Sequence, residues 1–216
     1  MFISDYATTI NEYNAWLKAD DRFKFSKPSL RTLRNAEPGG ERDYEIYQLV
    51  PKDKEFKLLN NQMQQLFVFF IDGASFIDVD DHWKYQILVC KNPRAIVGFA
   101  TTYQLELNNG STATRISQFL ILPPFQKRGL GKVLLEAIYE VAMKDKLCSE
   151  ITVEDPSDDF QNMRDSFDIR LILSKGYFKA FKKREPITKD NFCDFTLSKS
   201  EVKEICKILK LTKSRV

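Results

Sequence analysis

The stretch that most constrains the fold of this chain is residues 115–135, where a hydrophobic segment leads into a glycine turn and then into an amphipathic helix. The turn carries Gln126, Gly129 and Gly131. A helix N-terminus has backbone N–H groups without intrahelical partners and a partial positive charge, so it suits a phosphate group. Glycines there omit the Cβ atoms that would hold a diphosphate away from those donors. The stretch therefore predicts a strand, a phosphate-binding turn and a helix.

Two common nucleotide-binding motifs do not match this turn. It lacks the Gly-Lys-Ser/Thr of nucleotide hydrolases, and it is one glycine short of the dinucleotide fingerprint. The pattern Gln-x-x-Gly-x-Gly after a hydrophobic strand resembles the pyrophosphate-binding turn of the GNAT acetyltransferases, which bind acetyl-CoA. Taken alone, the same glycines are also typical of an ordinary helix cap.

A second segment, residues 151–165, supplies candidate catalytic groups. A β-branched run ends in Glu154 and Asp155, followed by Pro156 and Ser157. Ligands of α/β sheets bind at the carboxyl ends of strands. Acetyl transfer needs a neutral amine, but a lysine ammonium has a pKa of about 10.4, so a nearby carboxylate has to accept its proton. Glu154 is therefore a candidate general base, while Asp155 or Ser157 is a candidate cap for the helix that follows.

Three separated segments resemble the type B histone acetyltransferase catalytic subunits of the GNAT superfamily, which acetylate newly made histone four. They are residues 74–83, 117–126 and 153–157. The resemblance implies the GNAT acyltransferase fold, an α/β architecture in which helices flank a mixed, mostly antiparallel twisted sheet, with a small C-terminal helical extension. It also implies a histone acetyltransferase that uses acetyl-CoA, by direct transfer and without a metal.

The resemblance implies roles for individual residues. Glu154 becomes the general base, with Asp155 and Asp72 as supporting carboxylates, although the family more often has glutamate at the position of Asp72. Tyr103 is expected to flank the groove for the histone tail, where the neighbouring Leu105 departs from an aromatic residue. The expected contacts with acetyl-CoA are Phe119, Leu120, Ile121, Gln126, Lys127, Arg128, Gly129, Leu130, Gly131, Lys132 and Ser157.

Acidic residues gather at residues 78–81 and 154–159. If both clusters face one groove, they attract a lysine-rich tail, and Asp78 is then a substrate-binding residue. The alternative is that residues 78–81 form a polar turn between a helix and a strand.

The remaining expectations concern organisation and partners. The predicted domains are an N-terminal extension (1–40), the GNAT core (41–182) and a C-terminal helical segment (183–216). The family usually carries a further domain before its core and works with a WD-repeat histone chaperone, so the expected partners are a histone tail and such a chaperone. Two alternatives stay open: a GNAT enzyme acting on a small amine or a protein N-terminus, and a histone-binding module without turnover.

Composition excludes other classes of protein. A net charge of +3 is too small to predict direct nucleic-acid binding, and no apolar run is long enough to cross a membrane. The four cysteines have no paired spacing, so they predict neither a zinc site nor a redox pair, and Cys90 is expected to be a buried thiol. The single histidine, His82, lies in a polar segment and does not suit a catalytic triad. These features favour the cytoplasm and the nucleus.

Hydrophobic periodicity predicts the other elements. Asn109-Gly110 is expected to be a hairpin turn, and Ser198 with Glu201 matches a capping box. The predicted strands are residues 44–50, 83–90, 95–107, 114–122 and 150–153, and the predicted helices are residues 6–17, 52–71, 129–141, 160–176 and 197–211.

Overall fold

The computed structural model describes residues 25–37, 40–92, 94–174 and 198–212. The helix predicted at residues 6–17 and the last two residues of the helix predicted at 160–176 lie outside these residues. No helix in the described part is long and apolar enough to cross a membrane.

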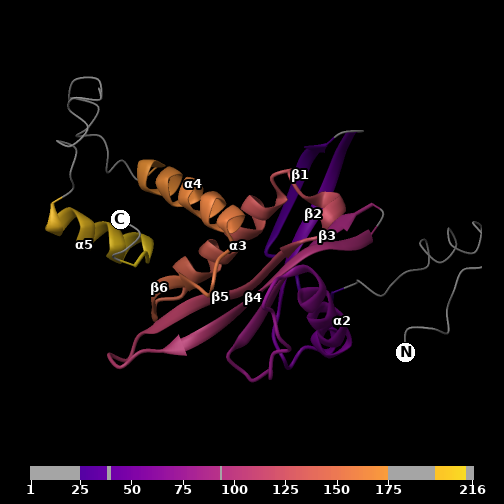
Figure 1. Ribbon diagram of the computed structural model, residues 1–216, viewed down its shortest axis with the longest axis horizontal. Helices are drawn as coiled ribbons and strands as arrows, with labels where there is room; N and C mark the ends of the chain where they lie inside the picture. Colours follow the sequence, from indigo (N-terminus) through magenta and orange to yellow (C-terminus); the bar gives the residue numbers. More distant parts are fainter. Residues whose placement is uncertain (1–24, 38–39, 93, 175–197, 213–216) are drawn as a thin grey trace, which may run out of the picture. The chain divides into compact units, whose positions relative to one another are not determined.

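Six strands form one sheet in the order of the chain (Figure 1). β1 pairs with β2, and β2 with β3, in antiparallel fashion, whereas β5 and β6 are parallel, so the sheet is mixed as predicted. The strands are β1 (Arg31–Glu37), β2 (Gly40–Leu49), β3 (Trp83–Lys91), β4 (Arg94–Glu106), β5 (Thr112–Ile121) and β6 (Cys148–Val153). β1 was not predicted from the sequence, while the other five strands are confirmed.

The described helices lie in the predicted stretches, except for a 3-10 turn after β5 that was not predicted. They are α2 (Lys54–Phe70), the short 3-10 helix η2 (Pro123–Phe125), α3 (Leu130–Lys144), α4 (Asp158–Ser174) and α5 (Lys199–Leu209). The capping box is confirmed, because the Ser198 side chain accepts from the Glu201 N–H and the Glu201 side chain accepts from the Ser198 N–H. The hairpin turn is also confirmed: Gly110 has φ +77° and its N–H donates to the Leu107 carbonyl.

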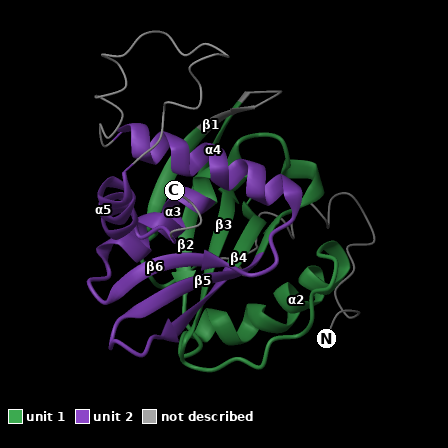
Figure 2. Cartoon of the chain, turned by 60° about the vertical axis from the view of Figure 1, so that its left-hand side comes forward, with its two compact units in different colours: residues 1–100, 119–134 green, residues 101–118, 135–216 purple. Residues whose placement is uncertain are grey.

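The chain divides into two compact units, and β4 and β5 contribute residues to both (Figure 2). The first unit comprises residues 1–100 and 119–134, and the second comprises residues 101–118 and 135–216. The domain boundaries predicted from the sequence stay predictions.

The core of the first unit forms between α2 and the strands. α2 buries Phe56, Met63 and Phe67, and the Phe67 ring lies edge-on to Phe99 of β4, 4.6 Å between centroids. α2 thus buries one face, to which Phe70 does not belong, since it is 48% exposed. Phe70 occupies the last position of the helix, where the chain turns away.

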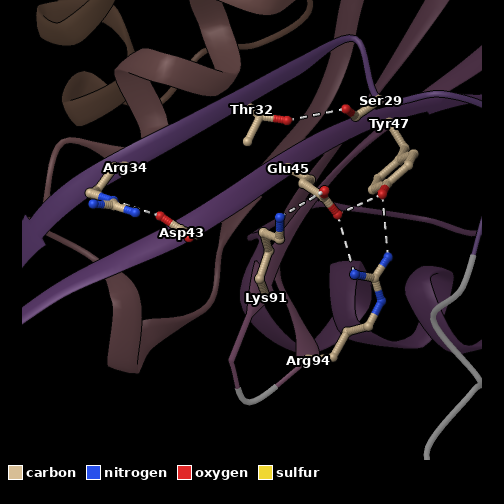
Figure 3. A network of polar contacts seen from close by, with 8 residues as sticks. All are labelled: Ser29, Thr32, Arg34, Asp43, Glu45, Tyr47, Lys91 and Arg94. Carbon is tan, nitrogen blue, oxygen red and sulfur yellow. Dashed lines mark hydrogen bonds and ion pairs between the residues drawn. The ribbon is translucent and has the colours of Figure 1, made fainter.

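A polar network connects β2 of the first unit to Lys91 at the end of β3 and to Arg94 at the start of β4 (Figure 3). The Tyr47 hydroxyl donates to Glu45 Oε2 at 2.6 Å, and Arg94 Nη1 donates to the same oxygen at 3.2 Å. Lys91 Nζ lies 3.5 Å from Glu45 Oε1. Burial taken alone raises the pKa of Glu45, but these hydrogen bonds and positive charges outweigh it, so the pKa lies below its ordinary value.

The second unit has a charged group at its centre. Arg164 and Asp168, one turn apart on α4, are 4% and 2% exposed. The Tyr139 hydroxyl of α3 donates to Asp168 Oδ1 and accepts from Arg164 Nε, each at 2.9 Å. Arg164 Nη2 also donates to the Ile151 carbonyl of β6 at 2.7 Å. Every charge in this group therefore has a partner, which offsets the cost of taking it out of water.

Candidate active site

A tight turn joins β5 to α3 in the first unit. The Gln126 side chain folds back, and its Nε2 donates to the Ile121 carbonyl at 2.8 Å. Lys127 and Gly129 have positive φ values of 58° and 77°. Alternating left-handed residues make successive backbone N–H groups converge, as in anion-binding concavities.

One of the two cationic side chains in this turn, that of Arg128, is held against the residues just before it. Arg128 Nη2 donates to the Pro124 carbonyl at 2.6 Å, and the guanidinium carbon lies 5.5 Å from the Phe125 ring centroid. The first turn of α3 carries no acidic side chain. Positive charge and the helix N-terminus therefore act together on any anion that approaches.

Gly129 leaves room for such an anion. Its carbonyl accepts from the Val133 N–H, so it stands at the start of α3. A Cβ built at Gly129 meets no heavy atom within 4 Å. The space beside the first residues of α3 is therefore open at this position, and together with the converging N–H groups it leaves room for a diphosphate.

The end of β5 lies unusually close to β4. A Cβ at Gly98 of β4 would lie 2.5 Å from Ile121 Cδ1 and 3.0 Å from the Leu120 carbonyl oxygen. The Leu122 N–H donates to the Val97 carbonyl at 2.9 Å. Gly98 therefore permits the packing that fixes the backbone of Leu120 and Ile121, a role that was not predicted from the sequence.

Glu154 follows the last residue of β6 in the second unit. Its N–H donates to the Ile116 carbonyl at 2.9 Å, so its backbone is held by β5. Its side chain is exposed, and its Oε2 accepts from the Ser117 hydroxyl at 2.6 Å. The carboxylate is thus oriented and reachable, as a general base has to be.

The residues after Glu154 turn the chain into α4. Asp155 has φ 35°, in the left-handed region, which aspartate tolerates better than most residues. The Ser157 hydroxyl accepts from the Phe160 N–H at 3.3 Å, so Ser157 caps α4 as one of the predictions stated. Arg164 holds β6 at Ile151, three residues before Glu154. The backbone is fixed on both sides of the candidate base.

The other predicted carboxylates lie on the loop between α2 and β3 in the first unit. Asp72 and Asp78 are both exposed. The buried Gln64 of α2 binds both main-chain polar groups of Ile77, accepting from its N–H at 2.5 Å and donating to its carbonyl at 3.2 Å. Three residues further on, Asp80 Oδ1 accepts from the His82 N–H at 2.8 Å and the Asp80 carbonyl accepts from the Trp83 N–H at 3.3 Å, so a polar turn forms at residues 80–83. It overlaps only the end of the turn expected at residues 78–81, and the substrate-binding role of Asp78 stays a prediction.

Comparisons with known proteins decide the family. Residues 44–164 match the Acetyltransferase (GNAT) family, more than half of the 216 residues. The chain belongs to this family. The xEco2 acetyltransferase domain bound to a K105-CoA conjugate has a similar structure, with a TM-score of 0.50, 12% identity, and coverage of 65% of this chain and 92% of that domain. At that identity the likeness shows the fold alone, and it confirms the predicted GNAT fold.

Curated relatives confirm the resemblance to one branch of the GNAT family. The chain is 33% identical over 196 residues to the histone acetyltransferase type B catalytic subunit of Kluyveromyces lactis, a match that covers 84% of this chain and 50% of that protein. The Homo sapiens protein of the same name is 30% identical over 219 residues, covering 95% of this chain and 52% of that protein. This GNAT chain thus spans about half the length of these relatives.

Within each unit of this GNAT chain, the structure groups some of the predicted residues. The first unit holds the glycine turn, from Gln126 to Lys132, together with Phe119, Leu120 and Ile121 at the end of β5. The second unit holds Glu154, Asp155 and Ser157 in one turn, with Tyr103 half-buried on β4. In the described residues, no cluster of histidine, cysteine or acidic side chains could hold a metal ion. Cys90 is buried, as expected.

Proposed function

We propose that this chain transfers the acetyl group of acetyl-CoA to lysine ε-amines on the N-terminal tail of newly synthesised histone four. The observation that carries the proposal is the exposed Glu154 carboxylate, held at the end of β6 by Ser117, in a chain of the GNAT family. The names of the relatives, histone acetyltransferase type B catalytic subunit, support the substrate class.

The transfer is direct, with no acetyl group stored on the protein. Glu154 accepts the proton that the lysine ammonium loses, so the neutral amine forms a C–N bond to the acetyl carbon as the thioester C–S bond breaks. The leaving thiolate takes up a proton from solvent. Asp155 and Asp72 support the reaction as further carboxylates near a cationic substrate.

Binding roles follow from the chemistry of each segment. The backbone of Phe119, Leu120 and Ile121 lies beside the acetyl-bearing arm and polarises the thioester carbonyl. Tyr103 and Asp78 contact the histone tail, and the Asp78 carboxylate attracts its positive charge. The pyrophosphate contacts are Gln126, Lys127, Arg128, Gly129, Leu130, Gly131 and Lys132, with Ser157 near the cofactor.

The proposal includes a partner protein and the compartments in which the chain acts. A WD-repeat histone chaperone is the expected partner protein, and the cytoplasm and nucleus are the expected compartments. Pull-down of the chain with such a chaperone, with and without a histone-four peptide, tests the partner independently of turnover.

The deciding experiment measures transfer of label from acetyl-CoA to three acceptors: a histone-four tail peptide, the same peptide with its lysines replaced by arginine, and a polyamine. Label on the lysine peptide alone supports the proposal. Label on the polyamine points instead to an acetyltransferase of small amines, and label on both peptides points to acetylation at the N-terminus. Peptide binding with no label on any acceptor would favour a module without turnover.

A further inference from the structure

The ladder between β5 and β6 ends at the candidate base. The parallel register pairs Ile116 with Val153, and the last main-chain hydrogen bond runs from the Glu154 N–H to the Ile116 carbonyl. The next residues along the two strands are Ser117 and Glu154. Their contact is made by side chains, with the Ser117 hydroxyl donating to Glu154 Oε2 at 2.6 Å.

This distance is that of a strong, charge-assisted hydrogen bond, which for O–H···O⁻ lies at roughly 2.5–2.7 Å. A glutamate side chain has three rotatable bonds, and fixing such a chain costs conformational entropy. The Ser117 hydroxyl offsets part of that cost before any substrate binds. Within the described residues, Glu154 Oε1 has no partner, so one oxygen is held and the other is left open for the incoming amine.

We propose that Ser117 is a positioning residue for this reaction, which holds the Glu154 carboxylate in the orientation that accepts the lysine proton. The proposal rests on the proposed function for its kinetic consequence, but not for its structural one. Ser117 itself does not touch the reacting atoms in this mechanism. Its contribution is to keep Glu154 in one rotamer, because proton transfer requires hydrogen-bond geometry.

The chain offers a matched control on the same pair of strands. Ser149 of β6 donates through its hydroxyl to the Thr112 carbonyl of β5 at 3.2 Å, and its hydroxyl lies 3.0 Å from that of Ser111. Ser149→Ala therefore removes a hydroxyl that links β5 and β6 away from Glu154. Ser117→Thr keeps the hydroxyl at the first position and serves as the rescue.

The kinetic test compares Ser117→Ala, Ser117→Thr and Ser149→Ala in the full chain with the lysine peptide. We expect Ser117→Ala to lower kcat about tenfold with little change in peptide KM or acetyl-CoA Kd, which is the pattern of a group that acts mainly in the transition state. Ser117→Thr should restore most of kcat, and Ser149→Ala should leave it unchanged. An unchanged kcat in Ser117→Ala, or equal losses in the two alanine variants, would overturn the proposal.

A second acceptor separates positioning from general loosening of the strands. A peptide whose target amine has a lower pKa than lysine depends less on the base, so Ser117→Ala should slow its acetylation less than that of lysine. If Ser117→Ala slowed the acetylation of both peptides equally, Ser117 would stabilise the end of the strand and would not position the base.

A measurement without turnover keeps this proposal distinct from the proposed function. The NMR order parameter of the Glu154 Cγ methylene in the free protein should fall in Ser117→Ala and stay unchanged in Ser149→Ala. If the wild type acetylates no lysine but the order parameter behaves as expected, the proposed function fails and the positioning contact stands. If the order parameter is the same in all three proteins, Ser117 does not position Glu154.

Discussion

At the scale of single residues, the candidate base combines a fixed backbone with an exposed carboxylate. The main chain of Glu154 is bonded to Ile116, and Arg164 anchors the same strand at Ile151. The side chain extends into solvent and is held at one oxygen. Glu154 is therefore placed by the fold without being buried, so a substrate amine can reach it.

Glu154→Gln tests the base directly. Glutamine keeps the size of the side chain but accepts no proton, so turnover with the lysine peptide should fall about a hundredfold or more near neutral pH. Turnover should recover partly as pH rises toward the lysine pKa of about 10.4, while the acetyl-CoA Kd stays the same. Glu150→Gln on the same strand is the control. Unchanged turnover in Glu154→Gln would shift the role to Asp155 or Asp72.

Gly129 offers an unusually clean test of phosphate binding. Gly110 in the β4–β5 hairpin has the same φ of +77°, and a Cβ at either glycine meets nothing within 4 Å. Leucine should therefore cost a similar amount at both positions, about 1–2 kcal/mol of backbone strain. Only Gly129→Leu should weaken acetyl-CoA binding, by about tenfold or more as seen by calorimetry. Equal Kd values for the two variants would contradict the phosphate cradle.

At this scale, a residue whose contacts lie within its own segment can be predicted from its neighbours along the chain. The left-handed turn at Gly129 and the cap at Ser157 are two such features, while the roles of Gln126 and Glu154 in binding and catalysis stay predictions. Ser117 lies 37 positions from Glu154, and only the register of β5 against β6 brings them together. Its role could not be predicted, because a serine on a strand carries no signal of what faces it.

At the scale of elements, the loop that carries the candidate carboxylates Asp72 and Asp78 is held to α2 by hydrogen bonds. Gln64 satisfies the main-chain N–H and carbonyl of Ile77, and its Nε2 also donates to Asn60 Oδ1 at 3.1 Å. The Tyr85 hydroxyl donates to that same Asn60 oxygen at 2.9 Å. The buried side-chain amide of Gln64 therefore supplies the main-chain hydrogen bonds that a neighbouring strand would supply in a sheet.

Gln64→Leu should loosen this loop. Leucine has a similar volume but no hydrogen-bonding groups, so the Ile77 N–H and carbonyl lose their partners at a cost of roughly 1–3 kcal/mol in the free energy of unfolding. Urea denaturation measures the loss, with Gln65→Leu at the exposed neighbouring position as the control. A loss no larger than that of the control would show that the loop holds its shape without Gln64.

The same scale explains which elements the sequence could predict. Helix α2 has a clear helical period because it buries one face in the core. The middle residues of β3 and β4 are buried without a break, and β5 alternates buried with half-buried residues, so all three carry a strong apolar signal. β1 contains few apolar residues and, within the described part of the chain, pairs only with β2, at the edge of the sheet. Its register is set by contacts with β2, such as the hydrogen bond from Arg34 Nε to Asp43 Oδ1 at 2.9 Å. Because these contacts involve another strand, the sequence of β1 taken alone carries no strand signal.

At the scale of the whole molecule, global stability depends on how charges lose water on folding. The carboxylate of Glu45 is mostly buried but receives hydrogen bonds from Tyr47 and Arg94 and lies beside Lys91. These partners favour the charged form more than burial disfavours it, so the pKa of Glu45 in the folded chain lies below its ordinary value. The unfolded chain should have a glutamate pKa of about 4.3.

Because the pKa of Glu45 is lower in the folded chain than in the unfolded chain, the free energy of unfolding falls as the pH falls. Above the unfolded pKa of about 4.3, Glu45 is charged in both states and its contacts stabilise the fold in full. As pH falls toward the folded pKa, the unfolded chain binds the proton first, so the stabilisation is lost progressively. We expect Glu45→Gln to lower the free energy of unfolding near pH 7 and to remove part of its decline between about pH 5 and pH 3. The curves of the two proteins should converge at low pH.

Urea denaturation across that pH range measures both curves, and Glu41→Gln on the same strand is the control. The Glu41 side chain is 64% exposed, and its contact with Arg34 is 3.5 Å long, so it should contribute little at any pH. Parallel curves for wild type and Glu45→Gln would mean that Glu45 is protonated equally in both states. In that case the contacts with Tyr47 and Arg94 would fix the geometry of β2 without linking the stability of the fold to pH.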